Sequence, residues 1–328
     1  MAGKTMRAVL YEGYGGGAAA LKHVEIPVPS PKKNEVLLKV EAASINPVDW
    51  KIQSGMLRPI LPPKFPFVPV TDVAGEVIEV GLGVQDFKAG DKVVSMLNSL
   101  KGGGLAEYAV ASVGLTVDRP PEVSAAEGAG LPIAAGTALQ ALKAGGATFD
   151  DTNKPSNVLI TAASGGVGSY AVQLAKLAGL HVTATCGARN IDFVKSLGAD
   201  EVLDYKTPEG KILKSPSGKK YDSVVHCTVG IDWSTFEPNL SASGKVIDIT
   251  PSPGTMVSSF VKKLMWAKKR VVPLLLIPKK EEFKFLVDMV KDGRLKTVVD
   301  SKYPLSKAEE AWAKSMEGHA TGKIIVEM

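Results

Sequence analysis

The fold of this chain is decided by residues 157–168, which read NVLITAASGGVG. The apolar run Val158–Ile160 predicts a buried strand, and the glycine-rich loop after it leads into a predicted helix over residues 170–177. Glycines let the backbone approach a pyrophosphate, whose charge is met by the N–H groups and the positive dipole end of the helix. We therefore expect a dinucleotide-binding loop formed by Ala163, Ser164, Gly165, Gly166, Val167 and Gly168.

The segments around this loop favour the nucleotide interpretation. Taken alone, a glycine-rich stretch is also compatible with an ordinary tight turn. Here, apolar strand-like runs alternate with helix-like segments, and the runs lie at residues 157–162, 181–185, 223–227 and 245–250. Nearly uninterrupted apolar strands are typical of parallel sheets that are covered on both faces. The sequence thus predicts an α/β fold with a Rossmann, doubly wound parallel-sheet domain.

The end of the second strand indicates which dinucleotide is bound. A site for NAD has Asp or Glu about 20 residues after the glycine loop, to hold the ribose 2′-hydroxyl. This chain has Cys186, Gly187 and Arg189 there, and an arginine suits a 2′-phosphate. NADPH is therefore the expected cofactor, with Tyr205 beside the adenine ribose. The alternatives are a solvated arginine at a helix start and a half-buried strand tyrosine.

The first third of the chain has a different pattern. Short strand-like runs at residues 35–41, 73–80, 91–96 and 105–110 are separated by glycine and proline, which predicts an antiparallel, barrel-like β domain. Helix-favouring, alanine-rich sequence begins near residue 126, and the last strand-like run, 322–327, is expected to return to the β domain. We predict one domain of residues 1–126 and 295–328, and a nucleotide domain of residues 127–294.

Composition excludes several classes of protein. The 328 residues are 45% hydrophobic and 22% charged, with a formal net charge of +5, which suits two globular domains and not a nucleic-acid-binding surface. Two cysteines, Cys186 and Cys227, cannot form a disulfide framework or a four-thiolate zinc lobe. No apolar window approaches the roughly 18 residues of a membrane-spanning helix. Because residues 1–11 already have a strand-like pattern, we expect no cleaved presequence.

Motifs along the whole chain point to one family. They read ASINPVDWK at residues 43–51, TDVAGEV at 71–77, GDKV at 90–93, GLAEY at 104–108 and AASGGVG at 162–168. Together they resemble the zinc-free quinone oxidoreductase branch of the medium-chain dehydrogenase/reductase superfamily. YGGGAA at 14–19, TCGARN at 185–190 and HATGK at 319–323 resemble the plant chloroplast-envelope members of this branch. The resemblance implies a GroES-like β-barrel catalytic domain beside the Rossmann domain.

The resemblance also implies roles for individual residues. Zinc-bearing relatives carry Cys where this chain has Asn46, and Gly-His-Glu where it has residues 71–73, so we expect no metal site. Asn46 and Lys51 are the expected donors to a developing enolate oxygen, and Asp49 is expected to orient its neighbours or the cofactor ribose. Lys51 would donate the proton itself, order a water or bind the nicotinamide ribose. From the residues alone, a turn-capping asparagine and a solvated lysine remain alternatives. The further cofactor contacts implied by the resemblance are Thr137, Leu275 and Lys323.

The function implied is that of an NADPH-dependent, zinc-independent reductase. It would transfer hydride to the activated C=C of alkenals, enones or oxylipin ketols, or to quinones. The alternative is an NADPH-binding sensor, or a membrane- or nucleic-acid-associated protein with little turnover. Residues 260–270 combine an apolar stripe with five cations, which is compatible with a membrane surface or with packing on their own domain. By resemblance we expect a homodimer without nucleic acid, peripheral to the inner chloroplast envelope and without a cleaved transit peptide, and otherwise a cytoplasmic protein.

Overall fold

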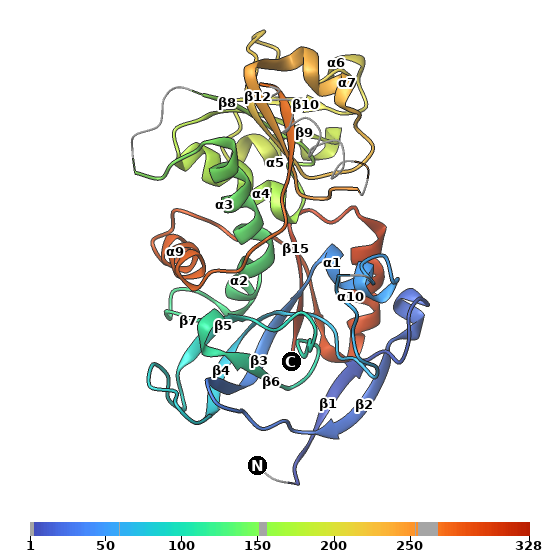
Figure 1. Ribbon diagram of the computed structural model, residues 1–328, viewed down its shortest axis with the longest axis vertical. Coiled ribbons are helices and arrows are strands. Elements are labelled where there is room, and N and C mark those ends of the chain that lie inside the picture. The colour runs from blue at the N-terminus through green and yellow to red at the C-terminus, as the bar shows by residue number, and fades with distance from the viewer. Residues whose placement is uncertain (1–2, 59, 151–155, 253, 255–267) are drawn as a thin grey trace. The chain divides into compact units, whose positions relative to one another are not determined.

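The chain divides into two compact units in a computed structural model that describes residues 3–58, 60–150, 156–252, 254 and 268–328 (Figure 1). Unit 1 comprises Met1–Gly136 and Pro278–Met328, and unit 2 comprises Thr137–Ile277. Unit 1 is built mainly of strands, and unit 2 alternates strands with helices. This arrangement confirms the predicted α/β fold with a barrel-like β domain and a parallel-sheet domain.

The strands of unit 1 are mostly antiparallel. They are β1 (Thr5–Leu10), β2 (Lys22–Pro27), β3 (Glu35–Ile45), β4 (Asp72–Val80), β5 (Lys92–Met96), β6 (Tyr108–Ser112), β7 (Thr116–Asp118), β14 (Val299–Pro304) and β15 (Lys323–Glu327). Seven of them form a sheet in the order β14-β15-β3-β4-β5-β7, with β6 also paired to β3, while β1 and β2 form a separate antiparallel pair. Strand β3 is therefore the centre of the sheet, and it is buried along most of its length.

Helices cover the sheet of unit 1. They are α1 (Pro47–Gln53), α2 (Ala125–Ala129), α9 (Lys280–Lys291) and α10 (Ala308–Glu317), with short helical turns at η1 (Gly17–Ala20), η2 (Val113–Leu115), η3 (Leu131–Ala135) and η6 (Leu305–Lys307). Trp312 on α10 is fully buried in the core, where its Nε1 donates to Oε1 of Gln53 at 3.1 Å. The Gln53 amide donates in turn to the Gly17 carbonyl at 2.9 Å. Helix α10 thus holds the end of α1 in place.

Unit 2 contains a six-stranded, all-parallel sheet. Its strands are β8 (Asn157–Ile160), β9 (His181–Cys186), β10 (Glu201–Asp204), β11 (Tyr221–His226), β12 (Leu240–Asp248) and β13 (Arg270–Pro273). Its helices are α3 (Gly136–Gly145), α4 (Gly166–Leu177), α5 (Ile191–Ser196), α6 (Pro208–Lys211) and α7 (Trp233–Phe236), with turns η4 (Ala188–Asn190) and η5 (Glu237–Asn239). The order β10-β9-β8-β11-β12-β13 is the Rossmann order, and it reverses direction between β8 and β11. Ligands of such sheets bind at the carboxyl ends beside this reversal.

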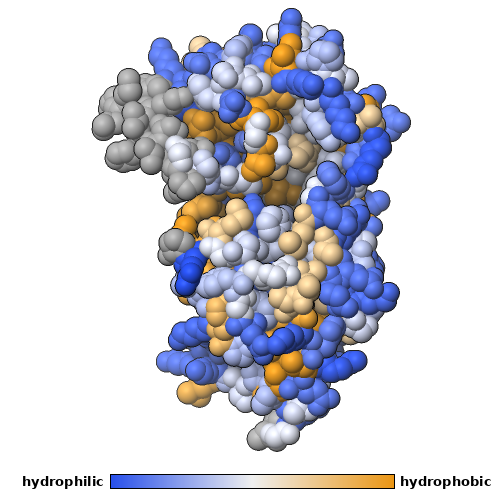
Figure 2. Space-filling view, turned by 90° about the vertical axis from the view of Figure 1, so that its right-hand side faces the viewer, coloured by the Kyte–Doolittle hydropathy of each residue, from blue (hydrophilic) through white to orange (hydrophobic). Residues whose placement is uncertain are grey.

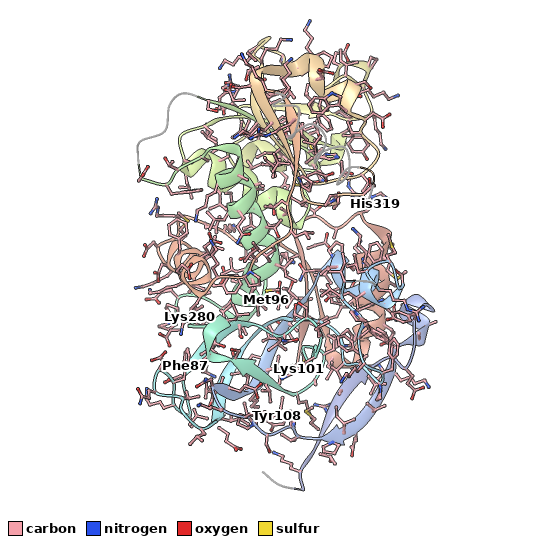
Figure 3. The ribbon with its side chains drawn as sticks, viewed as in Figure 1. Phe87, Met96, Lys101, Tyr108, Lys280 and His319 are labelled. Carbon is pink, nitrogen blue, oxygen red and sulfur yellow. The ribbon has the colours of Figure 1, made fainter. Side chains whose placement is uncertain are left out.

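The unit boundaries differ from the domain limits inferred from composition. Helix α9, which lies within the predicted nucleotide domain, and helix α2, which the predicted boundary at residue 126 divides, both belong to unit 1. Helix α9 contacts η3 and β7, and the ammonium of Lys280 lies 5.1 Å from the ring centroid of Phe87 (Figure 3). The hydroxyl of Thr297 also donates to the Glu127 carbonyl at 3.1 Å. Helix-favouring composition therefore begins before the chain leaves unit 1.

Polar and charged residues dominate the face seen in Figure 2, with apolar residues between them. Within the residues described, no helix is both long enough and apolar enough to span a membrane. Of residues 260–270, considered above as a membrane-binding stripe, 260–267 lie outside the described residues.

Candidate functional site

Three adjacent strands of unit 1 bring a group of buried polar residues to one end of the sheet. Asn46 follows the last residue of β3, Asp72 begins β4, and Lys323 begins β15. Strand β3 pairs with β4 on one side, where Ser44 lies opposite Asp72, and with β15 on the other, where Ile45 lies opposite Ile324. Because β3 and β15 are antiparallel, the residue after Ile45 lies opposite the residue before Ile324, which places Lys323 beside Asn46. All three are at most 3% exposed. The topology thus assembles a buried cluster from distant segments.

Gly322 determines how Lys323 enters the sheet. Its φ of +94° is a conformation that residues with a side chain rarely adopt. A Cβ at this position would lie 2.3 Å from the Val298 carbonyl oxygen, and the same oxygen accepts the Lys323 N–H at 2.8 Å. A glycine is therefore required directly before Lys323. This is the local reason for the Gly-Lys pair in the C-terminal motif.

The carboxamide of Asn46 has a partner for each of its polar hydrogens. Its Nδ2 donates to the Ser44 carbonyl at 3.1 Å and to Oδ2 of Asp72 at 3.0 Å, and its Oδ1 accepts from Nζ of Lys323 at 2.5 Å. An amide group has only two donor hydrogens. Donation from Asn46 to an enolate, as the sequence analysis expected, would require one of these bonds to open.

Asp49 lies in the first turn of α1 and is 3% exposed. Its Oδ2 accepts the backbone N–H of Asn46 at 2.7 Å, so its carboxylate fixes the start of the helix. The expectation that Asp49 orients its neighbours therefore has a concrete contact, which is made to the backbone of Asn46.

Burial perturbs the ionisation of the cluster. Loss of hydration raises the pKa of Asp49 to about 7 and that of Asp72 to about 6, although the charge of Lys323 lowers both. Burial also lowers the pKa of Lys323, and the two carboxylates oppose that change. The Oδ1 atom of Asp72 is buried without a hydrogen-bond partner. The two aspartates therefore bind protons at a higher pH than they would in water.

Lys51 lies on α1, two residues beyond Asp49. Its ammonium is 5.7 Å from the ring centroid of Trp50, and partial burial lowers the pKa of Lys51. A lysine with a lowered pKa gives up a proton more readily than one in water. The half-buried position makes Lys51 different from the freely solvated lysine considered as its alternative.

The buried cluster does not fit a zinc ion. Zinc sites use thiolate, imidazole and carboxylate ligands, whereas here an amide and an ammonium lie beside Asp49 and Asp72. Among the residues that the structure describes, no group of three or more His, Cys, Asp or Glu side chains could hold a metal ion. A cation bound at the carboxylates would be repelled by Lys323.

In unit 2, the glycine-rich loop joins β8 to α4 as expected. A Cβ on Gly168 would lie 2.3 Å from the Ala162 carbonyl oxygen, so the helix can approach the strand only because this residue is glycine. The helix start at Gly165 has no side-chain cap and no acidic residue in its first turn. The Ala163 N–H donates to the Thr185 carbonyl at 2.8 Å, which ties the loop to β9. Such a helix start suits an anionic pyrophosphate.

The expected 2′-phosphate contacts follow β9 and β10. A Cβ on Gly187 would lie 3.5 Å from the Tyr205 ring, so Gly187 and Tyr205 are neighbours. Lys206, which sequence reasoning missed, places its ammonium 5.9 Å from the centroid of that ring. Arg189 is exposed on η4. Cys186 is buried, and burial raises the pKa of its thiol to about 11, so it is a neutral strand-end residue.

The remaining predicted contacts of unit 2 lie on α3 and after β13. Thr137 is buried near the start of α3. The side chain of Gln140 on the same helix forms two hydrogen bonds with the backbone of Ile277, at 2.6 and 3.1 Å. These bonds hold the segment that contains Leu275, whose side chain is 57% exposed.

His226, which lies in the strand-like run predicted at residues 223–227, is a further buried polar residue. It ends β11, where its Nδ1 lies 3.0 Å from the hydroxyl of Thr161 and burial lowers its pKa. Cys227, the last residue of the predicted run 223–227, follows the last strand residue. Cys227 is half-buried, and loss of hydration raises the pKa of its thiol to about 12.

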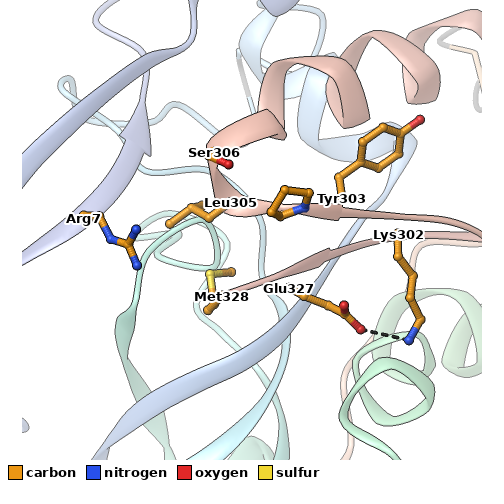
Figure 4. Close-up of a pocket in the computed structure, with 8 residues that line it drawn as sticks. Arg7, Lys302, Tyr303, Leu305, Ser306, Glu327 and Met328 are labelled. Carbon is orange, nitrogen blue, oxygen red and sulfur yellow. Dashed lines mark hydrogen bonds and ion pairs between the residues drawn. The ribbon is translucent and has the colours of Figure 1, made fainter.

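A surface pocket in unit 1 lies among other residues. It has a volume of about 270 Å³ and is lined by Arg7, Lys302, Tyr303, Pro304, Leu305, Ser306, Glu327 and Met328 (Figure 4). Lys302 and Glu327 form an ion pair there at 2.8 Å, with both side chains about half exposed. None of the residues predicted for catalysis or cofactor binding lines this pocket.

Comparisons with known proteins agree with this architecture. The profile of the alcohol dehydrogenase GroES-like domain matches residues 32–122, and that of zinc-binding dehydrogenases matches residues 197–326. The chloroplast envelope quinone oxidoreductase homolog of Arabidopsis thaliana is 70% identical to this chain over 328 residues, which is 100% of both sequences. The NADPH-dependent alkenal/one oxidoreductase, chloroplastic, of the same plant is 32% identical, covering 98% of this chain and 80% of that protein.

Solved structures show the same relationship. The quinone oxidoreductase from Coxiella burnetii is 31% identical and has a TM-score of 0.87, covering 99% of this chain and 100% of that one. The resemblance inferred from the sequence motifs is therefore confirmed along the whole length of the chain. The chain belongs to the quinone oxidoreductase family of the medium-chain dehydrogenase/reductase superfamily and is an oxidoreductase.

Proposed function

We propose that this oxidoreductase uses NADPH to reduce the activated C=C of α,β-unsaturated carbonyl compounds, or quinones, without a metal ion. The observation that carries the proposal is an uncapped helix start after β8 together with Arg189 just after β9 and Lys206 just after β10, with no carboxylate among residues 187–191. Relatives named as a quinone oxidoreductase homolog and as an NADPH-dependent alkenal/one oxidoreductase support both parts of the proposal.

The cofactor would be held by residues of unit 2. The pyrophosphate would face Gly165 and the first N–H groups of α4, because a helix start with no side-chain cap has unsatisfied donors. The 2′-phosphate would be bound by Arg189 and Lys206, and Tyr205 would flank the adenine ribose. An aspartate or glutamate at the Gly187 position would favour NADH instead.

The chemistry supplied by bound NADPH is hydride transfer to an electrophilic carbon. The protein must then stabilise the negative oxygen of the substrate and deliver a proton to the neighbouring carbon. Lys51 suits both tasks, because partial burial lowers its pKa while its ammonium keeps three donor hydrogens. Asn46 would contribute through the cluster, since both of its amide hydrogens already have acceptors.

Substrate reduction is tested by following the oxidation of NADPH, with NADH in parallel, against a short alkenal, a long-chain oxylipin ketol and a naphthoquinone. We expect turnover that prefers NADPH. Lys302→Met should leave this turnover unchanged, because Lys302 lines the surface pocket, which contains no residue predicted for catalysis or cofactor binding. NADPH binding without oxidation by any acceptor would refute the reductase and favour an NADPH-binding sensor. Turnover with NADH alone would refute the cofactor assignment.

Location and assembly are further parts of the proposal. The 70% identical relative is named for the chloroplast envelope, and we propose that this chain works in the chloroplast, peripheral to the inner envelope. Pairing of two copies through β13, the last strand of the parallel sheet, would give a homodimer. Fractionation of chloroplasts tests the first statement, and sedimentation of the purified protein tests the second.

A further inference from the structure

The buried cluster of unit 1 has more ionisable groups than its contribution to folding explains. Asp49, Asp72 and Lys323 are each at most 3% exposed. Buried ion pairs are often no more stabilising than apolar side chains of the same volume, because the charges lose their hydration. Folding alone therefore does not account for three ionisable groups around one amide.

The contacts within the cluster hold the Asn46 carboxamide in one orientation. Lys323 donates to one end of the Asn46 carboxamide, and Asp72 accepts from the other end. Asp72 also accepts the backbone N–H of Ile133 at 3.0 Å, which fixes its carboxylate. An amide held by a cation at its oxygen and by an anion at its nitrogen cannot rotate by 180° without reversing both interactions.

The held amide belongs to the start of α1. Asn46 precedes the first helical residue, and its N–H is bound by the carboxylate of Asp49. Lys51 follows on the same seven-residue helix. The start of α1 therefore determines the position from which Lys51 acts. Burial raises the pKa of Asp49 most strongly, and the charge of Lys323 opposes that rise.

We propose that Lys323 and Asp72 are positioning residues, which lock the Asn46 carboxamide and keep the start of α1 in its working geometry. This inference rests on the proposed reductase function, and it makes Lys323 a partner of Asn46 and not a ligand of the cofactor. The charged groups that act on Asp49 are Asp72 and Lys323. Tyr11 also lies near, since its pKa is raised mainly by burial and in addition by the charge of Asp49.

The first test uses the ligand-free protein. Carboxyl carbons of labelled aspartate are titrated by NMR, with Asp49→Asn and Asp72→Asn to assign their signals. Because Lys323 favours the ionised form of Asp49, Lys323→Met should raise the Asp49 midpoint by about one pH unit. Lys302→Met, which removes a half-exposed lysine from the same unit, should leave it unchanged. An unchanged Asp49 midpoint in Lys323→Met would overturn the proposal.

The second test measures steady-state kinetics as a function of pH. Lys323→Met should lower kcat about tenfold or more, the effect expected for a lost hydrogen bond to a charged group, and should shift the acid limb of the profile to higher pH. The dissociation constant of NADPH should stay within about twofold of wild type, since a positioning residue does not contact the cofactor. Weakened NADPH binding with an unchanged pH profile would overturn the inference.

A double variant separates positioning from simple stability. Lys323→Met leaves buried carboxylates without their counter-ion, so it should unfold more easily than wild type. Adding Asp72→Asn removes one negative charge and should restore much of the lost stability, while kcat stays low because the Asn46 oxygen still has no donor. Recovery of kcat together with stability would show a purely structural role. If wild type reduces none of the acceptors, the reductase proposal fails, while the Asp49 titration still decides the coupling within the cluster.

Discussion

Replacing Gly168 by alanine tests the nucleotide loop most directly. The new Cβ would lie 2.3 Å from the Ala162 carbonyl oxygen and 2.7 Å from the Cα of Ala163, and both are backbone atoms that cannot rotate away. Relief of the clash requires α4 to move from β8 by roughly 1 Å. Overpacking of this kind costs about 1–3 kcal/mol. For a domain of this size, that cost lowers the unfolding temperature by about 2–12 °C.

Gly165→Ala is the matched control. Its Cβ would meet the Ala162 oxygen at 3.4 Å, an ordinary contact, and the φ of −79° is accessible to alanine. The ligand-free control should therefore unfold at the wild-type temperature. The methyl group that this variant adds at position 165 would lie where we expect the pyrophosphate. At an NADPH concentration of 100 times the dissociation constant, the free energy of unfolding of wild type should rise by about 2.7 kcal/mol, and that of the variant should rise less.

Differential scanning calorimetry with and without NADPH measures both effects. We expect Gly168→Ala to lose unfolding temperature in the ligand-free state and to lose the NADPH-induced increase. We expect Gly165→Ala to lose only the second. A ligand-free Gly168→Ala protein as stable as wild type, or a Gly165→Ala protein as destabilised as Gly168→Ala, would refute the close-packing argument.

Three further predictions concern specificity, catalysis and pH. Arg189→Ala and Lys206→Ala should each weaken the preference for NADPH over NADH about tenfold or more in kcat/KM, because a charge-assisted bond to the 2′-phosphate is lost, and should leave NADH kinetics unchanged. Lys51→Met should lower kcat about a hundredfold with little change in the KM for NADPH, as measured under saturating acceptor. The pKa values of Asp49 and Asp72, raised to about 7 and about 6, mean that the folded state binds protons that the unfolded state has released. The contribution of the two neutral carboxyl groups to the free energy of unfolding is therefore fully present below about pH 4. It is lost as the pH rises to about 7, by at most about 1.4 kcal/mol per pH unit for each group. Urea unfolding of the ligand-free protein at a series of pH values should show this fall in the free energy of unfolding, and Asp72→Asn should make the fall less steep. The same dependence on pH in wild type and Asp72→Asn would contradict this prediction.

The nucleotide-binding half of the fold could be read closely from the sequence. Apolar runs predicted β8, β9, β11 and β12, and the glycine loop lies between a strand and a helix in the structure. These features are local, because strand periodicity and turn chemistry depend on neighbouring residues. The positions of the unit boundaries, in contrast, depend on contacts between residues that are distant in sequence. Helices α2 and α9 have helix-favouring composition, but which unit they join depends on tertiary packing.

The candidate site in unit 1 was only partly predictable. Asn46 and Asp49 are neighbours in sequence, and their motif marked them together. Lys323 and Asp72 reach Asn46 through the registers of β15 and β4 with β3, which no sequence period encodes. Lys206 could have been found from its place beside Tyr205, because a lysine next to a residue expected at a phosphate is itself a candidate phosphate ligand.

The discontinuity of unit 1 has a consequence for the order in which the newly made chain folds. Strand β15 pairs with β3 and carries Lys323, so the sheet and its buried cluster stay incomplete until residues 299–327 have been synthesised. Unit 2, which is continuous from Thr137 to Ile277, is synthesised earlier and contains its whole parallel sheet. On the ribosome, the edge of β3 therefore waits unpaired while unit 2 emerges, which exposes it to the mispairing that unpaired strands invite. Chaperone binding during synthesis should concentrate in this interval.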